Sequence, residues 1–145
     1  MMKKLIVRRG CDSDRQGLQA LLASHQMDTN IDPVEFWAAE VDGFLAGAAR
    51  LESEDGLVYL RPIVVDRRWQ AKGIGRALIT ELITDLPKLN VIARGEAVGF
   101  YVQMGFVPLA WGEVPDRFCQ ECADCYDLEI CQPKPMTWQQ SQVPS

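Results

Sequence analysis

Residues 57–86 change from a β-rich run to a helical pattern across a turn that holds two glycines. Leu57–Val65 is rich in branched residues, and Pro62 within it cannot donate a ladder hydrogen bond, so we expect an edge or a bulge there. From Gly73 onward, apolar residues recur at helical spacing. A strand that leads through glycines directly into an amphipathic helix restricts the chain to folds that mix strands and helices.

The rest of the chain alternates between short β-rich runs and helical segments. Ser13-Asp14-Arg15-Gln16 matches a capping box and predicts the start of the first helix, and another helix is expected over Glu96–Met104. Asp42-Gly43 separates two β-rich runs, which is typical of a tight hairpin, and Glu54-Asp55-Gly56 predicts a second turn. Further strands are expected at Leu5–Arg9, Val34–Val41, Phe44–Leu51, Leu89–Ala93, Phe106–Ala110 and Tyr126–Cys131.

Length and composition favour one globular domain. The chain has 145 residues, of which 48% are hydrophobic and 24% are charged, unlike a disordered or fibrous protein. No apolar run approaches the roughly 20 residues of a membrane span, and the apolar stretch near the N-terminus is too short for a signal peptide. We therefore expect a cytoplasmic protein with one domain over residues 1–131 and a poorly ordered tail over residues 132–145.

Charge is distributed unevenly along the chain. The net charge of −5 argues against a nucleic-acid partner, because phosphate contacts need an excess of positive charge. Glu113–Cys131 holds six acidic residues and one arginine, whereas Arg61–Arg76 holds five basic residues and one aspartate. A basic stretch in an acidic chain favours a small anionic ligand near Arg61–Arg76.

The turn that precedes the long helical pattern has the features of a phosphate-binding loop. The first turn of a helix presents N–H groups without intrahelical partners and the positive end of the helix dipole. Gly73 and Gly75 carry no Cβ that would hold a phosphate away from these N–H groups, and Lys72 and Arg76 add positive charge. We expect a diphosphate ligand here; the simpler alternative is a tight strand-to-helix turn.

Gln70-x-x-Gly73-x-Gly75 is followed at residues 97–106 by a second motif, Ala-Val-Gly-Phe-Tyr-Val-Gln-Met-Gly-Phe. In order and spacing, the two motifs resemble the Q/R-x-x-G-x-G/A loop and the A-x-x-F-Y-x-x-x-G-F segment of the GNAT superfamily of acetyl-CoA-dependent N-acetyltransferases. The resemblance covers roughly Leu5–Leu109. It implies an α+β fold with a mixed, mostly antiparallel sheet of about six to seven strands, splayed at the fourth and fifth strands, with helices on both faces.

The resemblance further implies that the chain binds acetyl-CoA. The pantetheine arm would lie in the gap beside Leu57–Val65 and pair with the main chain of Ile63 and Val65, with Val64 between them. The loop that begins at Gln70 would hold the diphosphate through the backbone N–H groups of Ala71, Lys72, Gly73, Ile74, Gly75 and Arg76.

The resemblance places Tyr101 where the family often carries the general acid. In direct transfer an amine attacks the thioester, and coenzyme A leaves as a thiolate to which a nearby phenol can supply a proton. The alternative is that Phe100 and Tyr101 only pack in the core.

Two positions depart from the family pattern. Arg94 stands where many relatives carry asparagine; it would contact the pantetheine or a substrate carboxylate, or cap a helix end. Leu89 stands where relatives that acetylate protein N-termini carry a glutamate base, so that subgroup is in doubt. His25, the only histidine, is expected in a solvated place on or after the first helix. The remaining candidate bases are a water chain and the carboxylates Glu40, Glu52 and Glu96.

Four cysteines lie close together in sequence, at Cys119, Cys122, Cys125 and Cys131, whereas Cys11 is distant. Four thiols could ligate zinc or an iron–sulfur cluster, but the spacing lacks the second Cys-x-x-Cys pair of a zinc knuckle. Free or buried thiols are the simpler interpretation, so we predict no metal. Phe118-x-x-x-Cys122 also resembles a feature of some small-molecule GNAT relatives and leaves a pocket-lining role open for Cys122.

The leading hypothesis is transfer of acetyl from acetyl-CoA to a primary amine of a small molecule. The acidic residues of Glu113–Cys131 would attract an ammonium group, although a solvated acidic surface explains them equally well. The alternatives are an acyl-CoA-sensing module without turnover, a protein-amine acetyltransferase, and a metal knuckle that serves a partner protein. No motif identifies the acceptor, and the dimers common among GNAT relatives leave a homodimer open.

Overall fold

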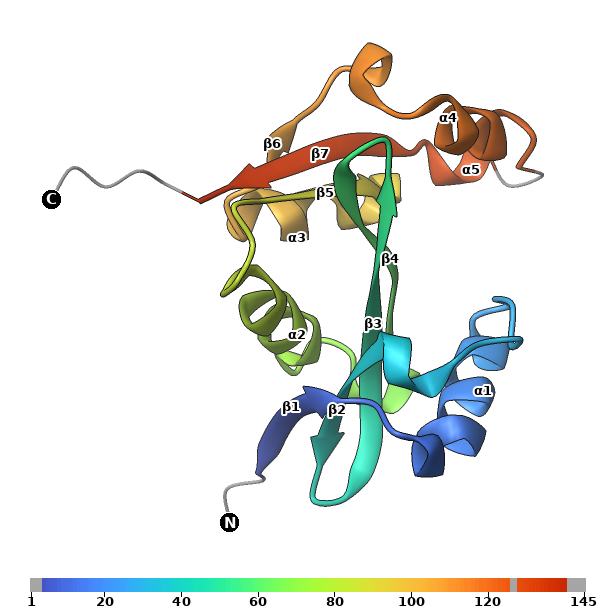
Figure 1. The fold of residues 1–145 in the computed structure, drawn as a ribbon, viewed down its shortest axis with the longest axis vertical. Coiled ribbons are helices and arrows are strands. Elements are labelled where there is room, and N and C mark those ends of the chain that lie inside the picture. Colours follow the sequence, from blue (N-terminus) through green and yellow to red (C-terminus); the bar gives the residue numbers. More distant parts are fainter. Residues whose placement is uncertain (1–3, 126–127, 141–145) are drawn as a thin grey trace, which may run out of the picture. The chain divides into compact units, whose positions relative to one another are not determined.

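The computed structural model describes residues 4–125 and 128–140. Within them, seven strands form one sheet in the order β1-β2-β3-β4-β5-β7-β6 (Figure 1). Strands β4 and β5 are parallel, whereas β1–β2, β2–β3, β5–β7 and β6–β7 are antiparallel. The expected mixed, mostly antiparallel sheet is therefore confirmed. The strands are β1 (Leu5–Arg9), β2 (Phe36–Val41), β3 (Phe44–Glu54), β4 (Leu57–Val65), β5 (Lys88–Ala93), β6 (Val107–Pro108) and β7 (Lys134–Gln139).

Helices connect and cover the strands. The α-helices are α1 (Arg15–Ser24), α2 (Ile74–Ile83), α3 (Val98–Gln103), α4 (Asp116–Ala123) and α5 (Leu128–Cys131). Short 3-10 turns occur at η1 (Asp12–Asp14), η2 (Pro33–Glu35), η3 (Arg67–Trp69), η4 (Gly95–Ala97) and η5 (Trp111–Glu113). Among the described residues, no helix has both the length and the apolar character that crossing a bilayer requires.

The chain divides into two compact units. Unit 1 comprises the described residues up to Leu51 together with Arg61–Thr84, and unit 2 comprises Glu52–Leu60 together with the described residues from Asp85 onward. Strands β3 and β4 contribute residues to both units. The predicted boundary at residue 131 does not follow this division, and the expectation of one domain stays a prediction.

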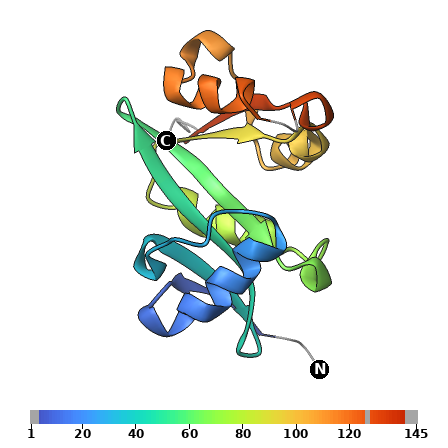
Figure 2. The same ribbon diagram turned by 90° about the vertical axis from the view of Figure 1, so that its right-hand side faces the viewer.

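In unit 1, α1 and α2 lie on opposite faces of the strands (Figures 1 and 2). Leu18 and Leu22 of α1 are buried in a core cluster with Phe36 of β2 and Val64 of β4. On the other face, α2 packs closely on β3 at Gly47. A Cβ added at Gly47 would lie 2.8 Å from Cγ2 of Ile74, so only glycine permits this approach.

In unit 2, α3 and α4 lie on opposite sides of β5 and β7 (Figure 1). Tyr59 of β4 is in register with Asn90 of β5, which is in register with Thr137 of β7. The ring of Tyr59 meets Phe118 of α4 edge-on, with 4.9 Å between ring centroids. Tyr59, Phe118 and Val114 form a buried cluster that fixes α4 on the sheet.

The structure confirms the predicted hairpin turns and corrects the predictions for residues 128–131 and 134–139. Both hairpin turns are confirmed, since Asp42-Gly43 and Asp55-Gly56 carry the paired positive φ angles of type I′ turns. Residues 134–139, assigned from sequence to a poorly ordered tail, instead form β7 between β5 and β6. Leu128–Cys131, expected as part of a strand, is helix α5; residues 126 and 127 of that expected strand lie outside the described residues.

Candidate functional site

The loop between β4 and α2 begins with a capped turn. The Asp66 side chain accepts hydrogen bonds from the backbone N–H of Arg68 at 2.9 Å and from its guanidinium group. These bonds stabilise η3, and the guanidinium of Arg68 holds the pKa of the Asp66 carboxyl below its usual value. Ala71 and Gly73 then adopt positive φ angles of 62° and 85°, and the chain turns sharply into α2.

The N-terminus of α2 is arranged to accept an anion. Gly73 is the N-cap residue, and its carbonyl accepts a hydrogen bond from the N–H of Ala77 at 3.0 Å. The N–H groups of residues 74–76 therefore have no partner within the helix. A Cβ added at Gly73 would meet no atom within 4 Å, so the space around this residue is open. Together with the helix dipole, this geometry suits a phosphate group.

Cations surround this N-terminus. The side chains of Lys72 and Arg76 are exposed, and no ion pair joins either of them within residues 4–125 and 128–140. Arg67 and Arg68 have partners within the protein. Arg67 donates to the carbonyl of Ser24 at 3.1 Å, and Arg68 pairs with Asp66 at 3.0 Å. The loop from Gln70 to Arg76 thus places the predicted diphosphate-binding residues together in unit 1.

At the end of β4, the main-chain N–H and C=O groups of successive residues point alternately toward β3 and away from it. The N–H of Asp66 donates to the carbonyl of Ala46 on β3 at 2.8 Å, so the main-chain groups of Ile63 and Val65 point away from β3. The sequence predicted that these groups pair with a pantetheine arm. The carbonyl of Val65 already accepts hydrogen bonds from Nε2 of His25 at 3.0 Å and from Nε2 of Gln70 at 3.3 Å.

Tyr101 lies in α3 of unit 2. Its ring packs edge-on against Phe100 and Phe106, with 5.2 Å between centroids in each pair, and the residue is 4% exposed. Burial raises the pKa of the Tyr101 hydroxyl, so the phenol keeps its proton at neutral pH. This environment is compatible both with core packing and with a group that donates a hydrogen bond.

Arg94 and the candidate bases all take part in ion pairs. Arg94 is exposed and pairs with Glu96 at 3.3 Å. Glu40 accepts from Arg8 at 2.8 Å, and Glu52 accepts from Arg117, which also binds Glu54. A carboxylate that acts as the base would have to exchange its arginine for the reacting amine, and the geometry favours none of the three.

The cysteines do not form a metal centre in the part of the chain that the structure describes. No group of three or more histidine, cysteine or acidic side chains there could hold a metal ion. Cys119 lies beside the core cluster of Phe118, where its Sγ is 3.6 Å from the carbonyl oxygen of Val114. Cys125 is exposed, whereas Cys122 and Cys131 are half-buried. None of the five cysteines, all of which lie within the described residues, forms a disulfide.

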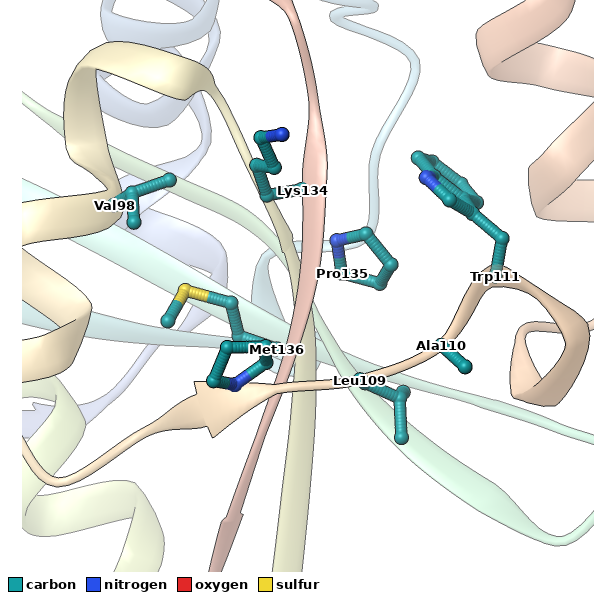
Figure 3. A pocket seen from close by; sticks show the side chains of 8 residues that line it. Val98, Leu109, Ala110, Trp111, Lys134, Pro135 and Met136 are labelled. Carbon is teal, nitrogen blue, oxygen red and sulfur yellow. The ribbon is translucent and has the colours of Figure 1, made fainter.

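Unit 2 also contains an open, mainly apolar pocket of about 240 Å³ (Figure 3). Its walls come from the start of α3, from β6 and the segment after it, and from β7. The lining residues are Val98, Pro108, Leu109, Ala110, Trp111, Lys134, Pro135 and Met136. None of the residues predicted from sequence to bind the cofactor or to act in catalysis lines this pocket.

A family model for the acetyltransferase (GNAT) domain matches residues 11–114, which is most of the chain. The chain belongs to the GNAT acetyltransferase family. Solved structures agree with this GNAT fold. N-acetylglutamate synthase from Neisseria gonorrhoeae, crystallised with coenzyme A and N-acetyl-glutamate, superposes with a TM-score of 0.75 at 16% identity over 98% of this chain. The match covers 36% of the synthase, so the GNAT chain spans about a third of its length.

Two further structures match the GNAT chain over almost their whole length. The ribosomal-protein-S18-alanine N-acetyltransferase from Escherichia coli is 17% identical with a TM-score of 0.65, over 97% of both chains. The diaminobutyrate acetyltransferase EctA from Paenibacillus lautus, in complex with its substrate and coenzyme A, is 12% identical with a TM-score of 0.63, over 99% of this chain and 100% of that one. At these identities the likeness shows the fold alone.

One contact in this GNAT chain has no counterpart in the sequence patterns. His25 follows α1 and is half-buried, and its ring binds the carbonyl of Val65 rather than lying fully in solvent. No motif marks this residue, because the contact joins segments 40 residues apart. The helical pattern that ends near Ser24 locates His25 at the end of a helix but not its partner.

Proposed function

We propose that this chain transfers the acetyl group of acetyl-CoA to a primary amine of a small molecule. The observation that carries the proposal is the N-terminus of α2 in a GNAT chain. It combines N–H groups without intrahelical partners, open space at Gly73, and Lys72 and Arg76, which form no ion pair with any residue that the structure describes. These are the features that bind a diphosphate. Acetyl-CoA carries a diphosphate, and two of the similar structures were crystallised with coenzyme A.

In the proposed reaction, the amine nitrogen attacks the thioester carbonyl carbon and the carbon–sulfur bond breaks. The sulfur leaves with the bonding electron pair and needs stabilisation as its negative charge grows. Tyr101, like any tyrosine, is protonated at neutral pH, and burial raises its pKa further, so it would donate a hydrogen bond to this sulfur. The acceptor arrives as an ammonium ion, so its nitrogen loses one proton before it attacks and a second after the carbon–nitrogen bond forms. Because the three candidate carboxylates are in ion pairs, we assign these protons to water.

The acceptor is proposed to be cationic before it reacts. Exposed acidic residues on and after α4 support this, among them Asp116, Glu121 and Asp124. Carboxylates at a surface attract an ammonium group and steer its approach. Among the similar structures, EctA acts on diaminobutyric acid, which carries primary amines.

Two alternatives keep specific support. The similarity to a ribosomal-protein alanine acetyltransferase favours a protein N-terminus as acceptor, although Leu89 here carries no carboxylate. The ion pairs at all three candidate bases favour a module that binds acyl-CoA without turnover. A cytoplasmic location and a homodimer stay predictions.

The binding step is tested by placing a carboxylate at the N-terminus of α2. Gly75→Glu should weaken acetyl-CoA binding at least ten-fold in calorimetry, because the new charge occupies the same N–H groups and repels the diphosphate. Thr80→Glu adds the same charge on the exposed side of α2, beyond its first turn, and should bind like the parent. Equal affinity of Gly75→Glu and the parent would refute diphosphate binding by this loop.

The transfer step is tested by following coenzyme A thiol release with a panel of small primary amines and with N-terminal peptides. A small amine that supports release, when the peptides do not, is the expected result. Tyr101→Phe should lower the rate of release by ten-fold or more with little change in the KM for acetyl-CoA. Tight binding without release for any amine would favour the sensing module instead.

A further inference from the structure

The end of α1 has a well-defined geometry. His25 is the C-cap residue, and Gln26 adopts the left-handed conformation at φ 57°. The N–H of Gln26 donates to the carbonyl of Ala23, and the N–H of Met27 donates to the carbonyl of Leu22, each at 3.0 Å. This pair of bonds is a Schellman motif. It fixes the main chain at His25, from which the imidazole ring reaches the carbonyl of Val65.

Two side chains, those of His25 and Arg67, join this helix end to the end of β4 and the loop that follows it. Nε2 of His25 lies 3.0 Å from the carbonyl oxygen of Val65, and Arg67 donates to the carbonyl of Ser24 at 3.1 Å. Gln70 donates to the same Val65 carbonyl at 3.3 Å. All of these residues lie in unit 1. The loop is therefore held at its first residues, before it reaches Ala71 and Gly73.

The Val65 carbonyl is the shared point of these contacts. A carbonyl oxygen has two lone pairs, and here His25 and Gln70 occupy them from different parts of the chain. Gln70 is the first residue of the Gln-x-x-Gly-x-Gly motif. The position of its side chain therefore depends on the same oxygen atom that His25 holds.

We infer that His25 is a positioning residue for the loop that binds the diphosphate. The ligand in this inference comes from the proposed function, whereas the contact between His25 and Val65 does not depend on that function. His25 donates to the Val65 carbonyl, and this bond fixes the exit of β4 and the start of the loop. The N–H groups at the N-terminus of α2 are then ordered before the ligand arrives, which lowers the entropy cost of binding.

The inference is tested by removing the donor and then restoring it. His25→Ala should weaken coenzyme A binding about ten-fold, since it removes one partly buried hydrogen bond that orders the loop. His25→Gln places an amide N–H at similar reach and should recover most of the affinity. Turnover at saturating acetyl-CoA should change less than KM, because His25 orders the loop rather than the reacting atoms.

Arg15→Ala is the matched control. Arg15 also lies on α1 and donates to a main-chain carbonyl, that of Ile31, at 3.1 Å, but away from the β4–α2 loop. It should lower stability to a similar extent and leave coenzyme A affinity unchanged. Equal affinity of His25→Ala and the parent, or an equal loss in Arg15→Ala, would overturn the inference.

Hydrogen exchange separates this inference from the proposed function. In the ligand-free protein, amides of residues 66–76 should exchange faster in His25→Ala than in the parent or in Arg15→Ala. If the parent binds no coenzyme A, the proposed function fails, and the exchange rates still decide whether His25 orders the loop. Unchanged exchange in His25→Ala would refute the inference even if the parent binds coenzyme A.

Discussion

Tyr101 combines an ionisable hydroxyl with an almost fully buried ring. The rings of Phe100 and Phe106 surround it, and the loss of solvent raises its pKa. A donor with a raised pKa releases its proton less readily than a solvated tyrosine. The chemical role open to Tyr101 is therefore a hydrogen bond that strengthens as charge develops on the acceptor.

The alkaline stability of the protein should report this burial. An unfolded tyrosine ionises near pH 10, whereas folded Tyr101 keeps its proton to higher pH. The Tyr101 contribution to the free energy of unfolding is thus complete below about pH 10 and declines above it, by up to about 1.4 kcal/mol per pH unit. Urea unfolding at pH 8–11 should show a steeper decline in the parent than in Tyr101→Phe. Parallel declines would contradict the predicted shift.

Asn90 and Thr137 are two polar residues that are buried in unit 2. They face each other across β5 and β7, with 1% and 7% of their surface exposed. Neither Oδ1 of Asn90 nor Oγ1 of Thr137 has a hydrogen-bond partner among the described residues. Burying a polar atom without a partner costs free energy, so these positions lower the stability of unit 2.

Thr137→Val should therefore stabilise the protein, by about 1 kcal/mol in urea unfolding, because valine has the same shape and no buried hydroxyl. Thr84→Val is the control, since the hydroxyl of Thr84 donates to the carbonyl of Thr80 at 2.9 Å. That variant loses a hydrogen bond and should gain nothing. A destabilised Thr137→Val would show that the hydroxyl has a partner in solution.

At the scale of elements, glycine decides how closely α2 packs on the sheet. A Cβ added at Gly47 would lie 2.8 Å from Ile74 and 3.0 Å from the main-chain oxygen of Val64. Ile74 is the first residue of α2, so this contact also sets the height of the helix N-terminus above the strands. The packing of β3 and the candidate phosphate loop are thus linked through one residue.

Gly47→Ala should lower the free energy of unfolding by about 1–3 kcal/mol through overpacking. Gly99→Ala is the matched control: Gly99 is an exposed glycine of α3, and a Cβ there would meet no atom within 4 Å. The free energy of unfolding of Gly99→Ala should instead rise by about 0.5–1 kcal/mol, because alanine has a higher helix propensity than glycine. Denaturant unfolding of both variants checks this, and a tolerated Gly47→Ala would refute the close approach.

Local signals predicted the elements that local chemistry determines. Asp42-Gly43 and Asp55-Gly56 specify their turns by their own positive φ angles, and Gly73 lies at the predicted start of α2. The start of α1 was less well predicted. Ser13 was expected as its cap, but the chain first forms η1, and Asp14 accepts a hydrogen bond from the N–H of Cys11.

Tertiary contacts explain the elements that sequence patterns missed. Leu-Glu-Ile at residues 128–130 alternates apolar and polar side chains, which is typical of a strand. The segment Leu128–Cys131 is too short for this pattern to distinguish a strand from a helix, and it forms α5. Within β7, Pro135 has no N–H to donate to a neighbouring strand. Its carbonyl accepts a hydrogen bond from the N–H of Leu109, so its nitrogen also points away from β5, and the pairing of β7 with β5 loses no hydrogen bond.

At the scale of the whole chain, the last strand is part of the fold. β7 pairs along the full length of β5 and also holds β6. Met136 in its centre is 1% exposed. Residues 134–139 therefore complete the sheet instead of forming part of a poorly ordered tail.

A chain that ends at Gln132 should lose the structure of unit 2, because β5 keeps only its short pairing with β4 and β6 loses its pairing with β7. A chain that ends at Gln140 keeps β7 and the bond from its N–H to the carbonyl of Pro87, and it should unfold like the full chain. Circular dichroism and hydrogen exchange of the β5 amides measure the difference. Protected β5 amides in the shorter chain would show that β7 is dispensable.

The two-residue length of β6 has a consequence for self-association. β6 is the outermost strand at its end of the sheet, and Pro108 offers no N–H to an incoming chain. At the opposite edge, β1 carries the exposed cationic side chain of Arg9, whereas Arg8 is paired with Asp14 and Glu40. A neighbouring molecule could form few backbone hydrogen bonds with β6, and at β1 it would meet the positive charge of Arg9. Concentrated solutions should therefore resist fibre growth by strand addition.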